Sequence, residues 1–343
     1  MRSNDVALPI ALLYSELHDL SAADADQPRR DGGYSAKRIN GRKYWYHQIW
    51  VGHDRVQRAL GPESPALLEQ IAAGRAEAEA WRSQNRKRQQ IIRSLKAALN
   101  MRTDRVTGRV LARLSELGVF KAGAVLIGTH AYMAYGPMLG VRIAQSNLRT
   151  GDIDFGAIDV AAADVRVSFA EAVQSADNAF FIVPARLGSR IPTALKYRGG
   201  ETRVELLTPL RKGRPWEPEV INSLQFGAQK APFLDYLIEE PVEATYLAGA
   251  GVRVTVPHPA RFALHKLIVA ANRGVSGHTK ALKDTAQAGE LLRVLFDAHG
   301  RELQRAATQL ARRGGAYVTK ARQGAARLDD ETRAAVLGYL RGK

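Results

Sequence analysis

The sequence predicts an α+β protein in which a mixed β-sheet is flanked by helices. Three observations predict it. Short β-rich runs and helical segments alternate between residues 120 and 256, and helical periodicity dominates from residue 258 to the C-terminus. Near the N-terminus, an Asn40-Gly41 turn joins two β-rich runs, which predicts a separate small sheet. Hydrophobic residues make up 45% of the 343 residues, enough to bury a substantial core.

The first hundred residues divide into three predicted parts. We expect residues 1–30 to form a flexible lead-in, because the stretch from Ser21 to Gly33 is rich in Ala, Asp, Arg and Gly. Residues 31–62 predict the small sheet, built on the Asn-Gly hairpin signal. Residues 63–100 predict a long basic helix, with Ser64 as its N-cap and Pro65 at its first position.

The small sheet interleaves basic and aromatic side chains. Cations of this kind can follow a phosphate backbone while rings stack on bases, which predicts a nucleic-acid contact. The other interpretation is that the rings form the sheet's own core against the next helix, because so small a sheet needs them to fold. The cations are Lys37, Arg38, Arg42, Lys43, Arg55 and Arg58, and the rings are Tyr44, Trp45, Tyr46 and Trp50.

Composition limits the classes of partner and chemistry. The chain has 50 basic and 34 acidic residues, a net charge of +16, which favours polyanionic partners and equally favours plain solubility. It has no cysteine, which excludes disulfides, thiol catalysis and cysteine-ligated zinc. No apolar run approaches the roughly 20 residues that span a bilayer. The N-terminus lacks the features of a signal peptide, so we expect a cytoplasmic protein without membrane association.

Residues 101–257 contain the stretch that is most typical of a catalytic site. A strand from Ala124 to Ile127 turns through Gly128-Thr129 into a helix. Glycine lets a phosphate approach the backbone, and the helix N-terminus offers free N–H groups. The other elements expected here are a helix at 164–176, strands at 152–157, 180–183, 193–198 and 202–207, and a hairpin of 242–247 with 252–256. Residues 258–343 predict a helical region with helices at 261–273, 278–299, 301–313 and 329–340.

Three carboxylates fall on two of these strands. Asp152 and Asp154 are two residues apart, and strand side chains alternate faces, so both project from the same face. Two carboxylates that close repel each other unless a cation or hydrogen bonds neutralise them. Glu205 lies among β-forming residues on a separate strand, so we expect three carboxylates to converge on one sheet. Oxygen ligands of this kind suit Mg²⁺, which favours one or two carboxylates together with substrate phosphates.

These motifs carry a family resemblance. The order apolar-Gly-Thr, then Asp-x-Asp, then a lone acid in Val-Glu-Leu resembles the nucleotidyltransferase superfamily, which has the polymerase-β-like fold. Leu126–Tyr135, Arg149–Asp154 and Val204–Pro209 look like segments of an uncharacterised bacterial nucleotidyltransferase family. Pro257–Leu267 and Lys280–Asp284 are similar to the helical part of abortive-infection toxin nucleotidyltransferases. The resemblance covers residues 124–292 and implies a nucleotidyltransferase-type mixed sheet.

The resemblance implies an enzyme that moves an NMP from an NTP onto an acceptor, such as RNA, DNA or protein, and releases pyrophosphate. Gly128 and Thr129 would hold the NTP phosphates. Asp152, Asp154 and Glu205 would be the catalytic carboxylates and the ligands of two Mg²⁺ or Mn²⁺ ions. The sequence departs from the family pattern in having Gly-Thr in place of Gly-Ser, Glu in place of Asp, and a longer gap between Thr129 and Asp152.

Two cations are further candidates for the nucleotide site. Arg149 directly precedes the Asp152 strand, where it would contact phosphate or position the strand. Lys266 shares a helix face with Arg273, and this face would meet the triphosphate or pair with a nearby acid. Lys280 and Asp284 stand at i,i+4 spacing, which predicts only a local salt bridge.

Two other functions fit parts of the sequence. A glycosyltransferase also uses Asp-x-Asp to hold a metal and a nucleotide sugar, although the chain lacks an obvious nucleotide-binding βαβ unit before Asp152. A nucleic-acid-binding protein with an inactive transferase domain would explain the positive charge and the basic–aromatic sheet.

Overall fold

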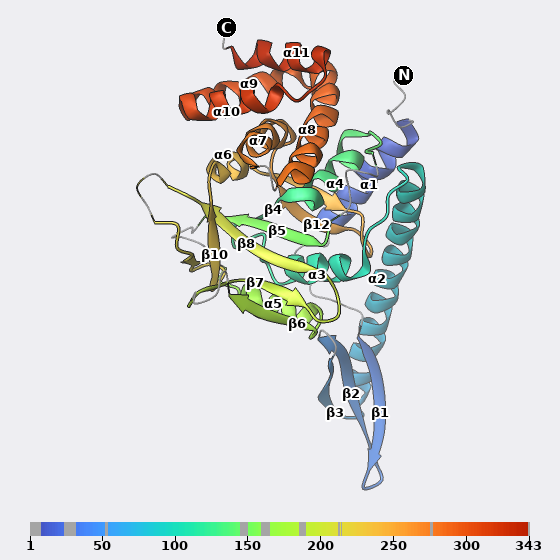
Figure 1. The fold of residues 1–343 in the computed structure, drawn as a ribbon. Coiled ribbons are helices and arrows are strands. Elements are labelled where there is room, and N and C mark those ends of the chain that lie inside the picture. The colour runs from blue at the N-terminus through green and yellow to red at the C-terminus, as the bar shows by residue number, and fades with distance from the viewer. Residues whose placement is uncertain are drawn as a thin grey trace.

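The computed structural model describes residues 8–23, 32–51, 54–144, 150–158, 165–184, 190–211, 213, 215–274 and 277–341. Within these residues a mixed sheet of seven strands lies at the centre, as predicted (Figure 1). The strand order is β4-β5-β8-β10-β9, with β7 beside the first half of β8 and β6 beside β7. The strands are β4 (Ala124–Leu126), β5 (Asp152–Ala157), β6 (Phe180–Pro184), β7 (Pro192–Tyr197), β8 (Arg203–Pro209), β9 (Glu219–Ile221) and β10 (Phe226–Ala231).

The two central strands, β5 and β8, run parallel and are in register from Asp152↔Arg203 to Gly156↔Leu207. Because side chains alternate along a strand, one face of the pair is apolar and the other polar. Ile153 and Phe155 are fully buried on the apolar face. The Phe155 ring lies 5.4 Å from the ring of Phe169, at the start of α5 (Phe169–Ala176). The carboxylates are therefore left on the opposite face.

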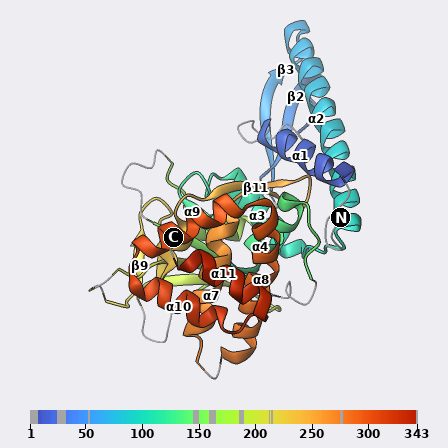
Figure 2. The ribbon, with the colours of Figure 1, turned by 90° about the horizontal axis from the view of Figure 1, so that it is seen from above.

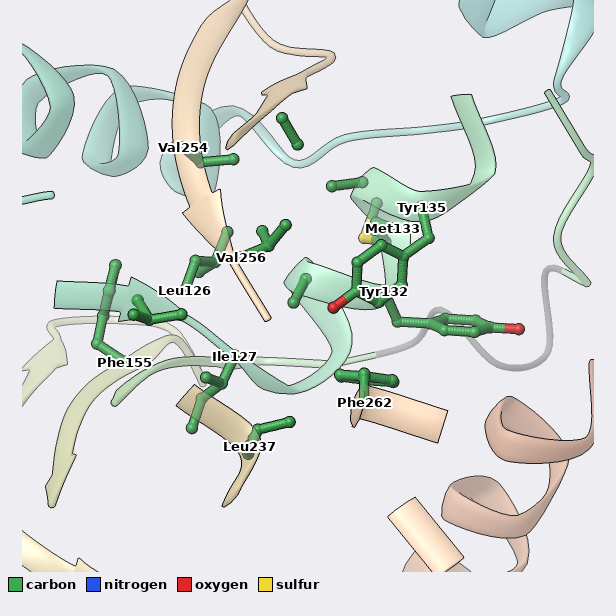
Figure 3. Close-up of a cluster of buried hydrophobic side chains, with 14 of the residues drawn as sticks. Leu126, Ile127, Tyr132, Met133, Tyr135, Phe155, Leu237, Val254, Val256 and Phe262 are labelled. Carbon is green, nitrogen blue, oxygen red and sulfur yellow. The ribbon is translucent and has the colours of Figure 1, made fainter. Parts of the chain in front are cut away.

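A second core layer anchors the helix that follows β4. Figure 3 shows Leu126, Ile127 and Phe155 near side chains of α4 (Gly128–Leu139), α6 (Leu234–Ile238), α7 (Pro259–Asn272) and β12 (Val252–Val256). The Tyr135 ring packs edge-on against Phe262 at 5.1 Å, and its hydroxyl donates to the carbonyl of Pro257 at 2.8 Å. These contacts fix the direction of α4 and the turn at its first residue. β12 pairs with β11 (Val242–Tyr246), which is the predicted hairpin.

The N-terminal segment differs from the expected flexible lead-in. Residues Leu8–Ala23 form helix α1, whereas we predicted residues 1–30 to be flexible. Leu17 of this helix is fully buried, and the Tyr14 hydroxyl accepts a 3.0 Å hydrogen bond from the backbone of Thr245. The helix is held by the central part of the chain, so the composition of the stretch after Ser21 could not reveal it.

The predicted small sheet and long helix are both present. The sheet consists of β1 (Gly33–Ile39), β2 (Arg42–Val51) and β3 (Asp54–Pro62). Asn40 and Gly41 both have positive φ, at 49° and 79°, as a type I′ hairpin turn requires. Helix α2 (Pro65–Ala98) begins at the Ser64 cap, whose side chain accepts from the backbone of Leu67. The views in Figure 1 and Figure 2 show this sheet and the start of α2 projecting from the rest of the molecule.

Helices complete the remainder of the described chain. The region after β12 is helical, as predicted, but it contains one helix that we did not predict, α10 (Gly315–Ala325). Among the described helices, none combines the length and apolarity that crossing a bilayer requires. The proposed division of the chain into five regions stays a prediction. The remaining helices are α3 (Arg105–Glu116), α8 (His278–Ala298), α9 (Gly300–Arg312) and α11 (Asp330–Leu340).

The crossing of α10 over α7 depends on Gly324. A Cβ at this position would overlap the backbone carbonyl of Leu267, so the helices touch through backbone atoms. We expect Gly324→Ala to lower the free energy of unfolding by about 1–3 kcal/mol or more, the usual cost of an overpacked core. Gly338→Ala, on α11 with open space around it, is the matched control and should be neutral or stabilising by up to about 1 kcal/mol. Equal denaturation midpoints for the two variants would contradict the close crossing.

Candidate active site

The three predicted carboxylates come from neighbouring positions of the central sheet. Asp154 on β5 is the register partner of Glu205 on β8, and Asp152 is the partner of Arg203. Register partners share a face, so Asp152, Asp154 and Glu205 all lie on the polar side of the sheet. All three are partly exposed, between buried apolar neighbours. The structure therefore brings together the acids that the sequence placed on separate strands.

The Gly128-Thr129 turn faces these acids. Gly128 has φ +66°, and a Cβ built on it would lie 2.6 Å from Oδ2 of Asp154. The backbone N–H of Ile127 donates to the carbonyl of Asp154 at 2.8 Å, which ties the turn to β5. Gly128 is also the first residue of α4, whose N-terminus carries free N–H groups and partial positive charge. Only glycine combines this φ with so close an approach to a carboxylate.

Crowding raises the pKa of Asp154 to about 7, from an ordinary value of 3.8. Loss of solvent is the largest cause, followed by the negative charges of Asp152 and Glu205. The ammonium groups of Lys266 and Lys280 act in the opposite direction but do not cancel the rise. Burial and the adjacent acids therefore act together against the charged form of Asp154, and a bound cation would favour that form.

Glu205 is engaged by a neighbour on its own strand. The Arg203 guanidinium lies 3.1 Å from Oε1 of Glu205, at a position where both side chains are partly exposed. Nε of Arg203 is buried and has no hydrogen-bond partner. Across the described part of the chain, no three His, Asp or Glu side chains are gathered closely enough to form a ready metal-binding group. The carboxylate chemistry suits Mg²⁺, and the Arg203 guanidinium contacts Glu205 at one of its two carboxylate oxygens, Oε1.

Lys266 lies at a buried ion cluster between α7 and α8. Its Nζ is 2.7 Å from Oδ1 of Asp284, while Nε of Arg273 is 2.6 Å from Oδ2. Burial alone would raise the pKa of Asp284, but these two cations hold it below its ordinary value. Of the two alternatives for the Lys266 face, the structure shows pairing with an acid. Asp284 pairs across helices, not with Lys280 as the i,i+4 spacing predicted.

Two lysines of α8 belong to the same electrostatic environment and were missed as site residues. Lys280 acts on Asp154, and Asp152 acts on Lys283, whose pKa is lowered mainly by burial and by the nearby Lys266. Lys280 and Lys283 are three residues apart, so they share one face of α8. That spacing was the only sequence signal for the two lysines as site residues. It was overlooked because Lys280 was interpreted as the partner of Asp284 in a local salt bridge.

The remaining predicted residues flank the turn and β5. Thr129 is buried in the first turn of α4. Arg149 lies outside the described residues. The Thr150 hydroxyl accepts from the backbone N–H of Asp152 at 3.1 Å and thereby holds the start of β5. His130, next to Thr129, is buried and bonded through Nδ1 to the Tyr246 hydroxyl at 3.0 Å, and burial lowers its pKa to about 4.

The raised pKa of Asp154 makes a stability prediction for the metal-free protein. An acid whose folded pKa lies above its unfolded value destabilises the fold as pH rises between the two, here from 3.8 to about 7. We expect Asp154→Asn to have the higher Tm in the presence of a chelator, with a gain that grows from pH 5 to pH 8. Each kcal/mol relieved raises Tm by about 2–4 °C in a protein of 150–250 residues, and by less in this longer chain. A gain that is constant with pH in thermal melts would contradict it.

Comparisons with known proteins identify the family of the chain. Residues 105–312, more than half of the chain, match a family model described as nucleotidyltransferase. Among solved structures, the chain is similar to an antigenic nucleotidyltransferase-like protein from Paracoccidioides brasiliensis. The two are 17% identical, the match covers 70% of this chain and 94% of that chain, and the TM-score is 0.35. No curated protein matches the chain. By the family match, the chain belongs to the nucleotidyltransferase family.

Proposed function

We propose that the protein transfers an NMP from an NTP to an acceptor and releases pyrophosphate, in a reaction that depends on Mg²⁺ or Mn²⁺. The observation that carries the proposal is the position of Gly128 against the carboxylate of Asp154, on the face that Asp152 and Glu205 share. A phosphate held at this turn would lie beside the acids that would hold the metal in this chemistry. Family membership supports the reaction class.

The metal site in this proposal consists of Asp152 and Asp154, with Glu205 as a third ligand. A bound divalent ion would supply the positive charge that stabilises the attacking and leaving oxygens. The surroundings of Asp154 support the fit, because burial and the negative charges of Asp152 and Glu205 raise its pKa, and a bound cation would offset both effects.

The nucleotide binds in this proposal with its phosphates between the Gly128 turn and α8. The N–H groups at the start of α4, with Thr129, contact the phosphates. Lys280 acts on Asp154 and Asp152 acts on Lys283, so in this proposal these two lysines neutralise the leaving pyrophosphate. An acceptor oxygen attacks the α-phosphorus, the bond from that phosphorus to the bridging oxygen breaks, and a carboxylate such as Glu205 takes the acceptor proton.

Lys266 has a different task from the one the sequence suggested. Its ammonium group is already held by Asp284 at 2.7 Å and lies over the Phe262 ring. We therefore assign it to positioning α8 against α7, with a long-range contribution to the charge at Asp154. Arg149 stays a candidate phosphate contact on sequence grounds alone.

A second candidate function is nucleic-acid binding by a chain whose transferase site is inactive. The Arg203–Glu205 ion pair is the observation that favours it, because it occupies the third carboxylate. The glycosyltransferase hypothesis finds no support in the family match. The resemblance to abortive-infection toxins, the cytoplasmic location and the six-cation nucleic-acid contact stay predictions.

Removal of both aspartate charges tests the proposed chemistry. We expect Asp152→Asn/Asp154→Asn to lower pyrophosphate release from NTP and Mg²⁺ by at least roughly 100-fold, more than the loss of an outer-shell partner costs. Each NTP is assayed against RNA, DNA and protein acceptors by radiolabel transfer. Mg²⁺ with a non-hydrolysable NTP should also raise the Tm of the native chain but not of the variant.

Asp330→Asn is the matched control, because this carboxylate lies far along the chain on the exposed first turn of α11. It should keep full activity. If the native chain shows neither transfer nor metal-dependent NTP binding with any NTP, the transferase proposal is wrong and the inactive-domain alternative stands.

Gly128→Ala tests the approach of the turn to Asp154. Alanine in the left-handed region costs roughly 1–2 kcal/mol, and its Cβ would press on the carboxylate. We expect clearly weaker binding of Mg²⁺ and non-hydrolysable NTP by calorimetry. Gly199→Ala is the matched control, since Gly199 has φ +75° with open space around it. It should lose some stability but keep its nucleotide affinity, and a similar loss of affinity in both would count against the proposal.

A further inference from the structure

The small N-terminal sheet has one face covered by α2 and one face open. Trp45 is 8% exposed, with the Arg75 guanidinium of α2 over its ring. The Tyr34 hydroxyl occupies the space where Gly74 of α2 would carry a Cβ. Tyr34 stacks on His47, its register partner, so these three rings all face the helix. Alternation along β2 therefore turns Tyr44 and Tyr46 to the other side, which we call the open face.

The open face carries cations whose observed partners are neutral. Lys37, the register partner of Tyr44, places its Nζ 5.0 Å from the Tyr46 ring centroid and donates to Gln57 at 3.3 Å. Arg55 donates to Gln48. Arg42 lies on the same face by register and is exposed. Residues 33–49 and 55–62 contain no Asp or Glu, and the one acidic residue of the three strands is Asp54, at the start of β3.

The cations on the other face are in a different environment. Lys43 pairs with Glu63 at 2.7 Å, and Glu63 also accepts from the Trp45 indole at 2.8 Å. Arg38 is the register partner of Lys43 and acts on the same carboxylate. Arg58 is the partner of His47. The six cations that the sequence grouped together are thus divided into three on each face.

An unpaired polynucleotide strand fits the open face better than other polyanions. Tyr44 and Tyr46 are partly exposed and lie two residues apart on one strand, about 6.8 Å between Cα atoms. A duplex hides the faces of its bases, and an acidic polypeptide offers none, so neither would use these rings. A single strand uses the cations for its phosphates and the rings for its bases. Lys37 already covers Tyr46, which leaves Tyr44 as the ring available for stacking.

We propose that the open face binds single-stranded nucleic acid, with Lys37, Arg42 and Arg55 at the phosphates and Tyr44 stacked on a base. This binding goes beyond nucleotide transfer and does not depend on the carboxylate cluster. It assigns a ligand to a surface that projects from the rest of the molecule (Figure 1).

Fluorescence anisotropy with the full chain tests the proposal, using labelled single-stranded DNA and RNA, their duplexes, and polyglutamate over a range of salt. Lys37→Gln/Arg55→Gln should weaken single-strand binding and make the slope of log affinity against log salt shallower by about 1.4, since each phosphate contact contributes roughly 0.7. Tyr44→Leu should weaken binding roughly tenfold, while Tyr44→Phe retains it, because stacking needs the ring and not the hydroxyl.

Arg38→Gln/Arg58→Gln is the matched control, removing the same charge from the face that packs on α2. It should bind nearly as the native chain does. Binding should also persist in Asp152→Asn/Asp154→Asn, which separates this proposal from the catalytic one. Equal losses in the control and open-face variants would overturn it. So would duplex binding that is tighter than single-strand binding and insensitive to Tyr44→Leu, or polyglutamate binding as tight as that of the single strand.

Discussion

The contact between a glycine turn and a carboxylate is the constraint on which the candidate site depends. Gly128 approaches Asp154 so closely that no side chain fits between them. The negative charges of two further acids, Asp152 and Glu205, also raise the pKa of this carboxyl group. Burial and these two neighbouring acids act against the charged form of Asp154, and the protein's own lysines offset only part of this effect. In the proposed function, a cluster of acids beside the free N–H groups of a helix N-terminus would take a cation together with an anion. A divalent ion with a triphosphate satisfies both.

The helical C-terminal region holds its cations at fixed places around this cluster. Arg261 at the start of α7 is 1% exposed and donates to the carbonyl of Tyr236, to Glu239 and to Gln309 of α9. A buried guanidinium with several partners is expensive to disrupt, so it locks α6, α7 and α9 together. Five residues later on α7, Lys266 then meets Asp284 of α8. The register of α8, and with it Lys280 and Lys283, follows from that pair.

The parts that could be predicted from sequence are those coded by neighbouring residues. Alternation along β5 put Asp152 and Asp154 on one face, and the Asn40-Gly41 and Ser64-Pro65 signals gave the hairpin and the start of α2. Helix α1 and the Asp284 cluster could not be predicted, because their contacts join residues far apart in the chain. Tyr14 bonds to Thr245, and Asp284 prefers Lys266 to its helical neighbour Lys280. Local spacing rules weigh only the near partner.

The distribution of partners among the cations separates two uses of the +16 charge. Near the carboxylates, Lys266, Arg273 and Arg203 are paired with Asp284 or Glu205, so their charges fix the positions of helices and strands. Within the described part of the chain, the contacts of Lys37 and Arg55 on the open face are to glutamine amides and, for Lys37, to a ring. A surface cation without an acid loses little on binding a phosphate, because no ion pair has to be broken first. Positive charge near the carboxylates therefore positions helices and strands, whereas positive charge on the projecting sheet is left available to a polyanion.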